Sequence, residues 1–330
     1  MSLADLLLTL PGRYLVESVC HSLTAAIIVE SALRAWRIGQ PMVQQRLRAL
    51  VILIPALAFP AYQLVDPDRG TISSRLNALL NTDEWLYLDL CQGVPVYPLF
   101  FLLLAVTAAI FFVQELFPIV RHLRGSAADG YRRLAPTEGE VIRDMVKAIP
   151  GEKPQIALLD ADDPLIFSTT GSEATIYVSR GIQAMLTHDE LQAAIAHEVA
   201  HVRRSQSSTL VMLFLLRALM FFNPVALIEF RRIVHAEEDI CDDVAVSWTR
   251  KPEALAIALQ RLYRTPDAPE AFHIDSVFDL RSALEEHSHK LHIVERIRRL
   301  RHVNSDREGG WLLVLAIVVV VIIAINYYVM

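Results

Sequence analysis

The chain has 330 residues, a formal charge of −6 and a mean hydropathy of +0.36, and 53% of its residues are hydrophobic. This composition is typical of a protein embedded in a membrane. The sequence contains no glycine-rich phosphate loop, no internal repeat and no basic patch of the kind that binds nucleic acid. Its basic clusters lie beside hydrophobic segments and are explained as membrane-flanking charge, so nucleic acid is excluded as a partner.

Four segments are long and apolar enough to cross a bilayer. In chain order they are residues 14–35, 49–65, 94–113 and 311–329. The last two contain no charged side chain, whereas Pro55 and Pro60 are expected to kink the second. In the first segment, Glu17 and His21 lie one helical turn apart. They are expected either to face the bundle interior or to lie near the lipid headgroups.

Arginines in the connecting segments indicate an orientation, because positive charge accumulates on the cytoplasmic side. Three clusters of arginine lie at the ends of the spans: Arg34, Arg37, Arg46 and Arg48 around the first connection, Arg121, Arg124, Arg132 and Arg133 after the third span, and Arg296, Arg298, Arg299 and Arg301 before the last. Residues 66–93 contain only Arg69 and Arg75. This pattern places both termini outside and residues 121–303 in the cytoplasm. The N-terminus lacks the basic start and the cleavage site of a signal peptide, so we expect it to remain as the first anchor.

A small mixed region follows the third span. Residues 136–148 are predicted to form a helix, because Pro136 and Thr137 provide a start signal. Short strands are predicted at residues 155–159, 165–168 and 175–178. A strand at the edge of such a sheet can bind an extended peptide through backbone pairing.

The next segment contains the sequence His-Glu-Val-Ala-His at residues 197–201. Thr187 and Glu190 form a Thr-x-x-Glu capping box, which predicts that a helix starts there. On that helix His197 and His201 lie one turn apart on the same face and can bind one zinc ion. Glu198 can act as general base towards a water on that metal. The alternative is a surface helix with two chance histidines, against which the predicted helical context argues.

Residues 207–228 form a fifth hydrophobic run. A span here would place the later acidic residues on the opposite side of the membrane from His197. The Asn223-Pro224 pair instead predicts a helical hairpin over residues 207–234, in which the zinc helix continues to about Phe222 and a second helix returns. The sequence leaves open whether this hairpin enters the bilayer or packs on the membrane helices.

The returning helix carries an acidic cluster that offers a third zinc ligand, which a catalytic site needs. We favour Glu238 as that ligand. Asp242, one turn later, could accept a hydrogen bond from the outer nitrogen of a zinc-bound histidine. Glu237 is the alternative ligand, because periodicity does not choose between the two. A solvated helix face is the other interpretation, and the apolar residues around the cluster weaken it.

The succession His-Glu-x-x-His and Glu-x-x-Cys-Asp resembles membrane-bound gluzincin peptidases. The likeness is greatest to the peptidase module of beta-lactam sensor/antirepressor proteases, followed by HtpX-type and CAAX prenyl-protease-type enzymes. Three shorter stretches also resemble the family. Residues 174–182 resemble its edge strand and the turn that follows, residues 221–224 resemble a helix break, and residues 291–300 resemble its Arg-Ile-x-x-Leu segment. The likeness covers residues 130–303 and departs from the family at Gln206, where relatives often carry Asp. It implies a bacterial inner membrane.

The fold class predicted is a mainly α membrane protein with four transmembrane helices and a gluzincin α+β zinc-peptidase domain that has a small edge-strand sheet. Residues 1–120 are predicted to form a membrane region with three spans, and residues 121–303 a cytoplasmic zinc metallopeptidase domain. Residues 311–329 are predicted to form the last span. The predicted activity is zinc-dependent endopeptidase cleavage of protein substrates at the cytoplasmic face. One alternative is a signal-transducing protease that inactivates a cytoplasmic repressor. Another is a non-catalytic zinc-binding scaffold, which would have no need of Glu198.

Several properties stay open at this point. The expected partners are a protein or peptide substrate and the lipid bilayer, and the sequence leaves open a regulatory partner, the oligomeric state, the cleavage specificity and the activating signal. His235 and Arg231 are the residues considered for stabilising an oxyanion. His287, His289 and His292 are better explained as solvent-exposed than as a second metal site. A disulfide between Cys20 and Cys91 is conceivable.

Overall fold

The computed structural model describes residues 9–65, 88–91, 93–117, 140–150, 153–169, 174–205, 209–263, 292–302 and 310–328. The chain divides into two compact units. The first, called the membrane unit here, comprises residues 1–126, 209–237 and 306–330. The second, called the peptidase unit here after the resemblance noted in the sequence, comprises residues 127–208 and 238–305. The predicted hairpin thus belongs to the same unit as the membrane helices.

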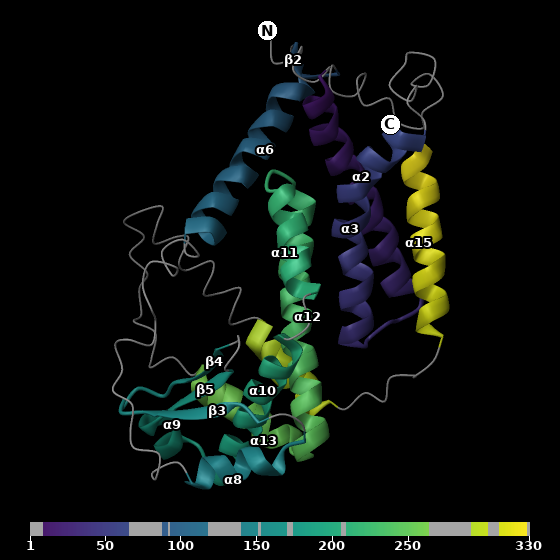
Figure 1. Ribbon diagram of the computed structural model, residues 1–330. Coiled ribbons are helices and arrows are strands. Elements are labelled where there is room, and N and C mark those ends of the chain that lie inside the picture. The colour runs from purple at the N-terminus through teal and green to yellow at the C-terminus, as the bar shows by residue number, and fades with distance from the viewer. Residues whose placement is uncertain are drawn as a thin grey trace. The chain divides into compact units, whose positions relative to one another are not determined.

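Among its described residues, the membrane unit has four helices that are long and apolar enough to span a bilayer, as the sequence predicts. They are α2 (Leu10–Ala35), α3 (Pro41–Val65), α6 (Val96–Phe111), which continues into the π-helical turn η2 (Phe112–Leu116), and α15 (Trp311–Tyr328). A two-stranded ribbon, β1 (Asp89–Cys91) and β2 (Val94–Pro95), precedes α6. Helices α2, α3 and α15 lie side by side and share an apolar core that includes Val29, Leu47 and Ile322 (Figure 1).

Helix α3 begins at Pro41, eight residues before the predicted start of the second span at residue 49. The prediction excluded Arg46 and Arg48 because they are charged. In the structure the guanidinium of Arg46 lies 4.6 Å from the centroid of the Trp311 ring. Pro55 and Pro60 lie inside α3 without ending it.

Arg48 is the centre of an ion-pair network that joins three helices of the membrane unit. Its Nη1 donates to Oε2 of Glu229 on α12 (Pro224–Thr249) at 2.9 Å, and its Nη2 donates to Oε2 of Glu30 on α2 at 3.3 Å. Arg232 adds a second cation, with its Nη1 2.8 Å from Oε1 of Glu229. Only 4% of the Glu229 side chain is exposed, so its charge depends on these two arginines.

Replacing Arg48 by Met is therefore expected to lower the stability of the protein by about 3 kcal/mol, because it leaves a buried carboxylate short of one partner. Thermal unfolding in detergent measures the effect. Arg34→Met is the matched control, since the Arg34 side chain is 78% exposed and pairs with the same Glu30. Equal melting temperatures for the two variants would show that the buried network does not hold the helices together.

Two helices joined by a tight turn form the region predicted as a hairpin. The first is α11 (Thr209–Leu219), and α12 follows after a turn at residues 220–223. The side chain of Asn223 fixes this turn: its Oδ1 accepts from the backbone N–H of Val225 at 3.0 Å, and its Nδ2 donates to Oγ of Ser22 on α2 at 2.9 Å. The turn therefore packs on a membrane-spanning helix.

The prediction that the zinc helix continues to Phe222 falls partly on residues 206–208, which lie outside the described residues. The zinc helix, α10, is described over His188–Ser205, and α11 is described from Thr209.

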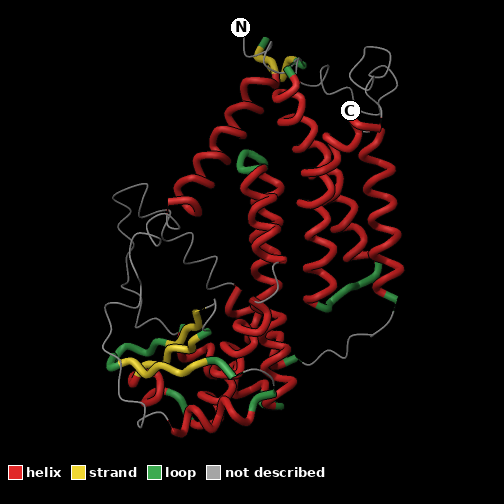
Figure 2. Tube along the Cα trace, viewed as in Figure 1, coloured by secondary structure: helices red, strands yellow, loops and turns green. Residues whose placement is uncertain are grey.

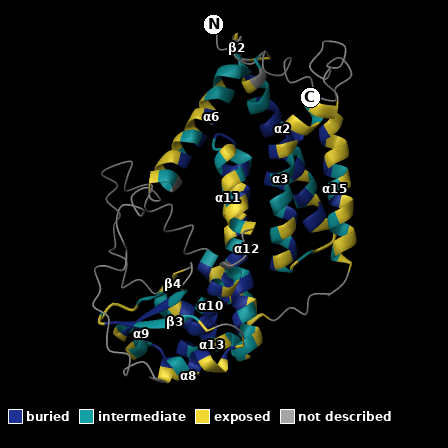
Figure 3. Cartoon of the chain, in the orientation of Figure 1, coloured by how far each residue is buried: buried dark blue, intermediate teal, exposed yellow. Residues whose placement is uncertain are grey.

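The two faces of α11 differ sharply. Large apolar side chains on one face are between 46% and 62% exposed, namely Val211, Met212, Leu215 and Leu219 (Figure 3). Arg217 is 1% exposed, and its guanidinium lies 4.8 Å from the ring centroid of Phe111 and 5.6 Å from that of Phe230. A row of exposed large apolar residues on a helix is what contact with lipid requires.

The peptidase unit is built on a three-stranded sheet with strand order β3-β5-β4 (Figure 2). The strands are β3 (Gln155–Leu159), β4 (Ile166–Thr169) and β5 (Thr175–Ser179). Strand β3 pairs in parallel with β5, and β4 pairs antiparallel with β5. The stretch at residues 174–182, which resembles the family's edge strand, is therefore the central strand here. Its near-continuous burial explains this position, and β4 is an outer strand of the described sheet.

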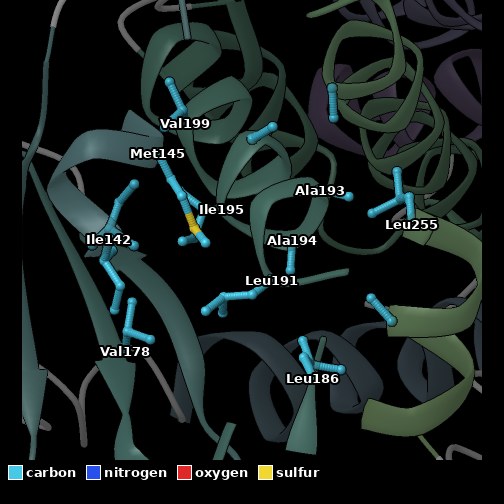
Figure 4. Packing of buried hydrophobic residues seen from close by; sticks show 14 of the residues in the cluster. Ile142, Met145, Val178, Leu186, Leu191, Ala193, Ala194, Ile195, Val199 and Leu255 are labelled. Atoms are coloured by element: carbon cyan, nitrogen blue, oxygen red, sulfur yellow. The ribbon is translucent and has the colours of Figure 1, made fainter. Parts of the chain in front are cut away.

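Helices cover the sheet and enclose the core of this unit. They are α8 (Glu140–Ala148), α9 (Arg180–Met185), α10, α13 (Pro252–Leu262) and the helical residues 292–301. Ile142 and Met145 of α8 and Val178 of β5 pack with Leu191, Ile195 and Val199 of α10 (Figure 4). Because the last three recur every four residues, α10 buries one face in this core. His197 and His201 lie on another face, which is thereby held in place.

A close approach of two chain segments fixes the start of α9. A Cβ atom on Gly181 would lie 1.9 Å from the backbone oxygen of Asp162, so only glycine fits there. Ser179 joins the same segments, since its Oγ accepts from the backbone N–H groups of Leu165 at 2.9 Å and Ile182 at 3.1 Å. These contacts hold the segment that leads into β4 beside the end of β5.

Candidate metal centre

The helix that carries the His-Glu-x-x-His motif starts where the sequence predicts. Helix α10 begins at His188, and the carboxylate of Glu190 accepts a hydrogen bond from the backbone N–H of Thr187 at 2.9 Å. This is the bond that the Glu of a capping box makes. The motif therefore lies in the middle of a well-formed helix, and both histidines project from the same face.

The structure brings His197, His201 and Glu238 together, with one potential ligand atom of each within 4.8 Å of the others. The Nε2 atoms of the two histidines are 3.0 Å apart. Oε2 of Glu238 lies 3.6 Å from Nε2 of His197, and Oε1 lies 3.4 Å from Nε2 of His201. Tetrahedral ligands at zinc bond lengths of about 2.1 Å are separated by about 3.4 Å. Two imidazole nitrogens and a carboxylate with these separations fit zinc.

Asp242 supports the first histidine from behind. Its Oδ1 lies 2.9 Å from Nδ1 of His197, and the aspartate side chain is fully buried. An acceptor at Nδ1 keeps the proton on that nitrogen and leaves the Nε2 lone pair pointing at the ligand cluster. Asp242 lies on α12, one turn after Glu238.

Arg296, which the sequence analysis did not select, lies in contact with this group. Its Nε and Nη2 donate to the two carboxylate oxygens of Asp242 at 2.8 and 2.7 Å, and its Nη1 donates to Oε2 of Glu238 at 2.9 Å. Its side chain is 3% exposed. Because Arg296 holds Oε2 of Glu238, the other oxygen is left to face His201. The signal in the sequence was a charged residue within the apolar stripe that Ile293 and Leu300 form.

Cys241 is the second residue that the sequence analysis left without a role. Its Sγ lies 3.5 Å from Nδ1 of His201, and its side chain is fully buried. Helix α12 therefore places a side chain behind each histidine: Asp242 behind His197 and Cys241 behind His201.

The charges of the centre shift the pKa values of its groups. Burial alone would lower the pKa of His197, but hydrogen bonds to Asp242 and Glu238 outweigh it and raise that pKa to about 9. Burial raises the pKa of Asp242, and the opposing hydrogen bonds of Arg296 and His197 bring it down to about 2. The pKa of Glu238 is likewise lowered, by both histidines against its burial. The carboxylates are thus ionised, and a cation that binds here displaces a proton from His197.

The three residues line a cleft of about 470 Å³ in the peptidase unit. Glu198 lies in the same cleft, beside the two histidines. One wall is the segment Pro164–Ser168, which includes the start of β4. Another wall comes from α13 and the residue after it, and consists mainly of apolar side chains: Leu255, Ala258, Leu259, Leu262 and Tyr263.

Other residues considered from the sequence lie elsewhere. Glu237 is buried and its Oε2 accepts from Nε2 of Gln45 on α3 at 2.6 Å, within the membrane unit. Arg231 donates to Gln114, and neither Arg231 nor His235 lines the cleft. Cys20 has a free thiol. His287 and His289 lie outside the described residues, and His292 belongs to no metal-binding group among the described ones.

A partly buried His-His-Glu cluster beside a glutamate, together with four apolar helices of spanning length among the described residues, is the arrangement of a membrane metallopeptidase. The family model described as BlaR1 peptidase M56 matches residues 97–256. The resemblance stated from the sequence is confirmed: the chain is similar to membrane zinc metallopeptidases of the BlaR1 and HtpX type.

Curated relatives carry the name of protease HtpX homologues. The protein of Lactiplantibacillus plantarum is 33% identical over 70 residues, which cover 21% of this chain and 23% of the relative. The Syntrophobacter fumaroxidans protein is 27% identical over 214 residues, covering 51% of this chain and 76% of the relative. That of Streptococcus agalactiae is 23% identical, covering 51% and 74%. The first of these matches spans less than a quarter of the relative's length, and together they support a membrane protease.

Proposed function

We propose that this protein is an integral membrane zinc endopeptidase that cleaves protein substrates at the cytoplasmic face. The observation that carries the proposal is the cluster of His197, His201 and Glu238 beside Glu198 in a cleft. The donor set and the separations between the ligand atoms favour zinc. A structural zinc site uses four protein ligands, whereas three ligands beside an open cleft are typical of a catalytic one.

In the proposed reaction each residue of the site has a separate role. A bound zinc ion would polarise the substrate carbonyl and acidify water. Glu198 removes a proton from the attacking water and passes it to the leaving nitrogen. Asp242 keeps the imidazole of His197 in the orientation that the ligand set needs. Arg296 holds Asp242 and one oxygen of Glu238, which fixes the position of the third ligand.

We place the substrate along β4. This strand pairs with β5 on one side only within the described sheet, and residues 165–168 line the cleft. An extended peptide can pair with its other side through backbone hydrogen bonds, as in other cases of strand addition. Such pairing is independent of side chains, so it orients a peptide over Glu198 and leaves selectivity to the α13 wall.

We further propose that the helical hairpin of α11 and α12 contacts lipid. The row of exposed apolar residues on α11 and the bonds from Asn223 to α2 support this placement. The predicted domain boundaries and the orientation, with both termini outside and the peptidase unit in the cytoplasm, are retained as part of the proposal. The arginine distribution supports them.

A peptide with both termini blocked tests the endopeptidase proposal. An acetylated and amidated peptide, incubated with the detergent-purified protein and zinc, is expected to be cut at internal bonds, and mass spectrometry identifies the products. Removal of single terminal residues from unblocked peptides only would show an exopeptidase instead. Zinc binding without any cleavage of peptides or casein would favour the non-catalytic scaffold.

Cysteine labelling tests the orientation. In a variant that lacks the natural cysteines at positions 20 and 91, Ser73→Cys is expected to react with a membrane-impermeant maleimide added outside intact cells, because residues 66–93 are predicted to lie outside. Asp144→Cys is the matched control, since this exposed residue belongs to the peptidase unit. It should react only after the membrane is opened. The reverse pattern would overturn the topology.

A further inference from the structure

We propose that Cys241 is a positioning residue for His201, and that its thiol sulfur accepts the Nδ1–H of that imidazole and so directs Nε2 to the metal. This inference rests on the proposed zinc site. It assigns to the cysteine of the Glu-x-x-Cys-Asp sequence a function other than packing, and it treats Cys241 and Asp242 as two parts of one support behind the histidine pair.

The orientation of the His201 ring follows from its contacts. Its Nε2 lies 3.0 Å from Nε2 of His197 and 3.4 Å from Oε1 of Glu238, so this nitrogen faces the ligand cluster. A neutral imidazole that offers a lone pair on Nε2 carries its proton on Nδ1. That nitrogen lies 3.5 Å from Sγ of Cys241, a distance at which sulfur accepts a hydrogen bond. Cys241 is therefore the acceptor that selects the metal-binding tautomer.

The same geometry argues against Cys241 as a metal ligand. Its sulfur lies on the Nδ1 side of the ring, away from the Nε2 atom that faces the cluster. The ligand group identified among the described residues consists of two histidines and a glutamate and contains no cysteine. The side chain is also fully buried, which leaves the thiol no opening to the cleft.

The two histidines consequently have unequal supports. Asp242 offers His197 a charged carboxylate oxygen at 2.9 Å, whereas Cys241 offers His201 a weak neutral acceptor. The side chain of His197 is 10% exposed and that of His201 is 27% exposed. Because residues that orient metal-bound histidines change metal affinity about 10- to 100-fold when removed, a weak acceptor should lie at the lower end of this range.

The test compares zinc affinities by chelator competition, which does not depend on peptidase activity. Cys241→Ala is expected to raise the zinc dissociation constant about 10-fold, because it removes the acceptor. Cys241→Ser keeps an acceptor and should recover a clear part of this loss. Cys20→Ala, a change in the membrane unit, should leave the affinity unaltered.

Two results would overturn the inference. Wild-type zinc affinity in Cys241→Ala would show that the thiol has no influence on His201. Equal losses in the Ala and Ser variants, together with equal losses in melting temperature, would show that Cys241 only fills space. Failure of the wild type itself to bind zinc would instead contradict the proposed function, so the two failures are distinguishable.

Discussion

Replacement of Glu198 by Gln is expected to abolish peptide cleavage while zinc stays bound. The glutamine is nearly the same size but cannot accept the proton from the attacking water, so the rate should fall about 10²- to 10⁴-fold. The metal should remain because the cluster that can hold it consists of His197, His201 and Glu238 and does not include Glu198. Casein cleavage and the zinc content of the same purified sample measure the two effects.

Glu253→Gln provides the control for the Glu198 variant. It makes the same chemical change on α13, where the side chain is 58% exposed and pairs with Arg301 outside the cleft. Its activity should equal that of the wild type. Undiminished cleavage by Glu198→Gln would remove Glu198 from the reaction, and loss of zinc in this variant would show that Glu198 holds the metal.

The second large effect distinguishes two neighbouring glutamates. Glu238→Ala is expected to reduce bound zinc to a small fraction of the wild-type content, because a catalytic site with two ligands loses most of its affinity. Glu237→Ala should keep its zinc and lose stability instead, by about 1.5 to 3 kcal/mol, because Gln45 loses a hydrogen bond to a charged partner. Metal analysis and thermal unfolding in detergent are measured on both variants.

Each of these two variants is a control for the other, because the two glutamates are adjacent on one helix. Both changes remove one carboxylate from the same helix, so a general loss of helix stability would affect them alike. Zinc loss in Glu237→Ala with full retention in Glu238→Ala would move the ligand by one residue. It would also contradict the placement of Glu237 against α3.

Local patterns were sufficient to predict the helix that carries the histidines. The capping box and the apolar spacing define α10 by interactions within about five residues, and such interactions can be predicted from the sequence. Local patterns could not decide whether Glu237 or Glu238 is the third ligand. The choice depends on the hydrogen bond of Glu237 to Gln45, which lies 192 residues away in the chain.

The contacts of Arg296 and Cys241 could not be predicted from the sequence either. Arg296 contacts Asp242 and Glu238 across 54 and 58 residues, and these contacts exist only after the helices pack. A buried arginine is expected to be rare, so hydropathy favours an exposed position for it. Cys241 contacts His201 across 40 residues and is indistinguishable in sequence from a packed thiol.

The bounds of α3 and the position of β5 also depend on contacts between elements. Helix α3 begins at Pro41, before the predicted span, and Arg48 within it pairs with Glu30 and Glu229. Strand β5 was assigned to the edge because its resemblance to the family gave no pairing information. Its residues are buried on both faces, as those of a central strand are.

The central claim is that His197, His201 and Glu238 hold one catalytic zinc ion. The most direct measurement is the zinc content of the detergent-purified wild type with casein cleavage recorded in the same sample, before metal removal, after removal with a chelator and after return of zinc. The account predicts close to one zinc per chain, loss of cleavage with the metal and recovery when zinc is restored. Cleavage that persists in metal-free protein, or a chain that binds no zinc, would contradict it.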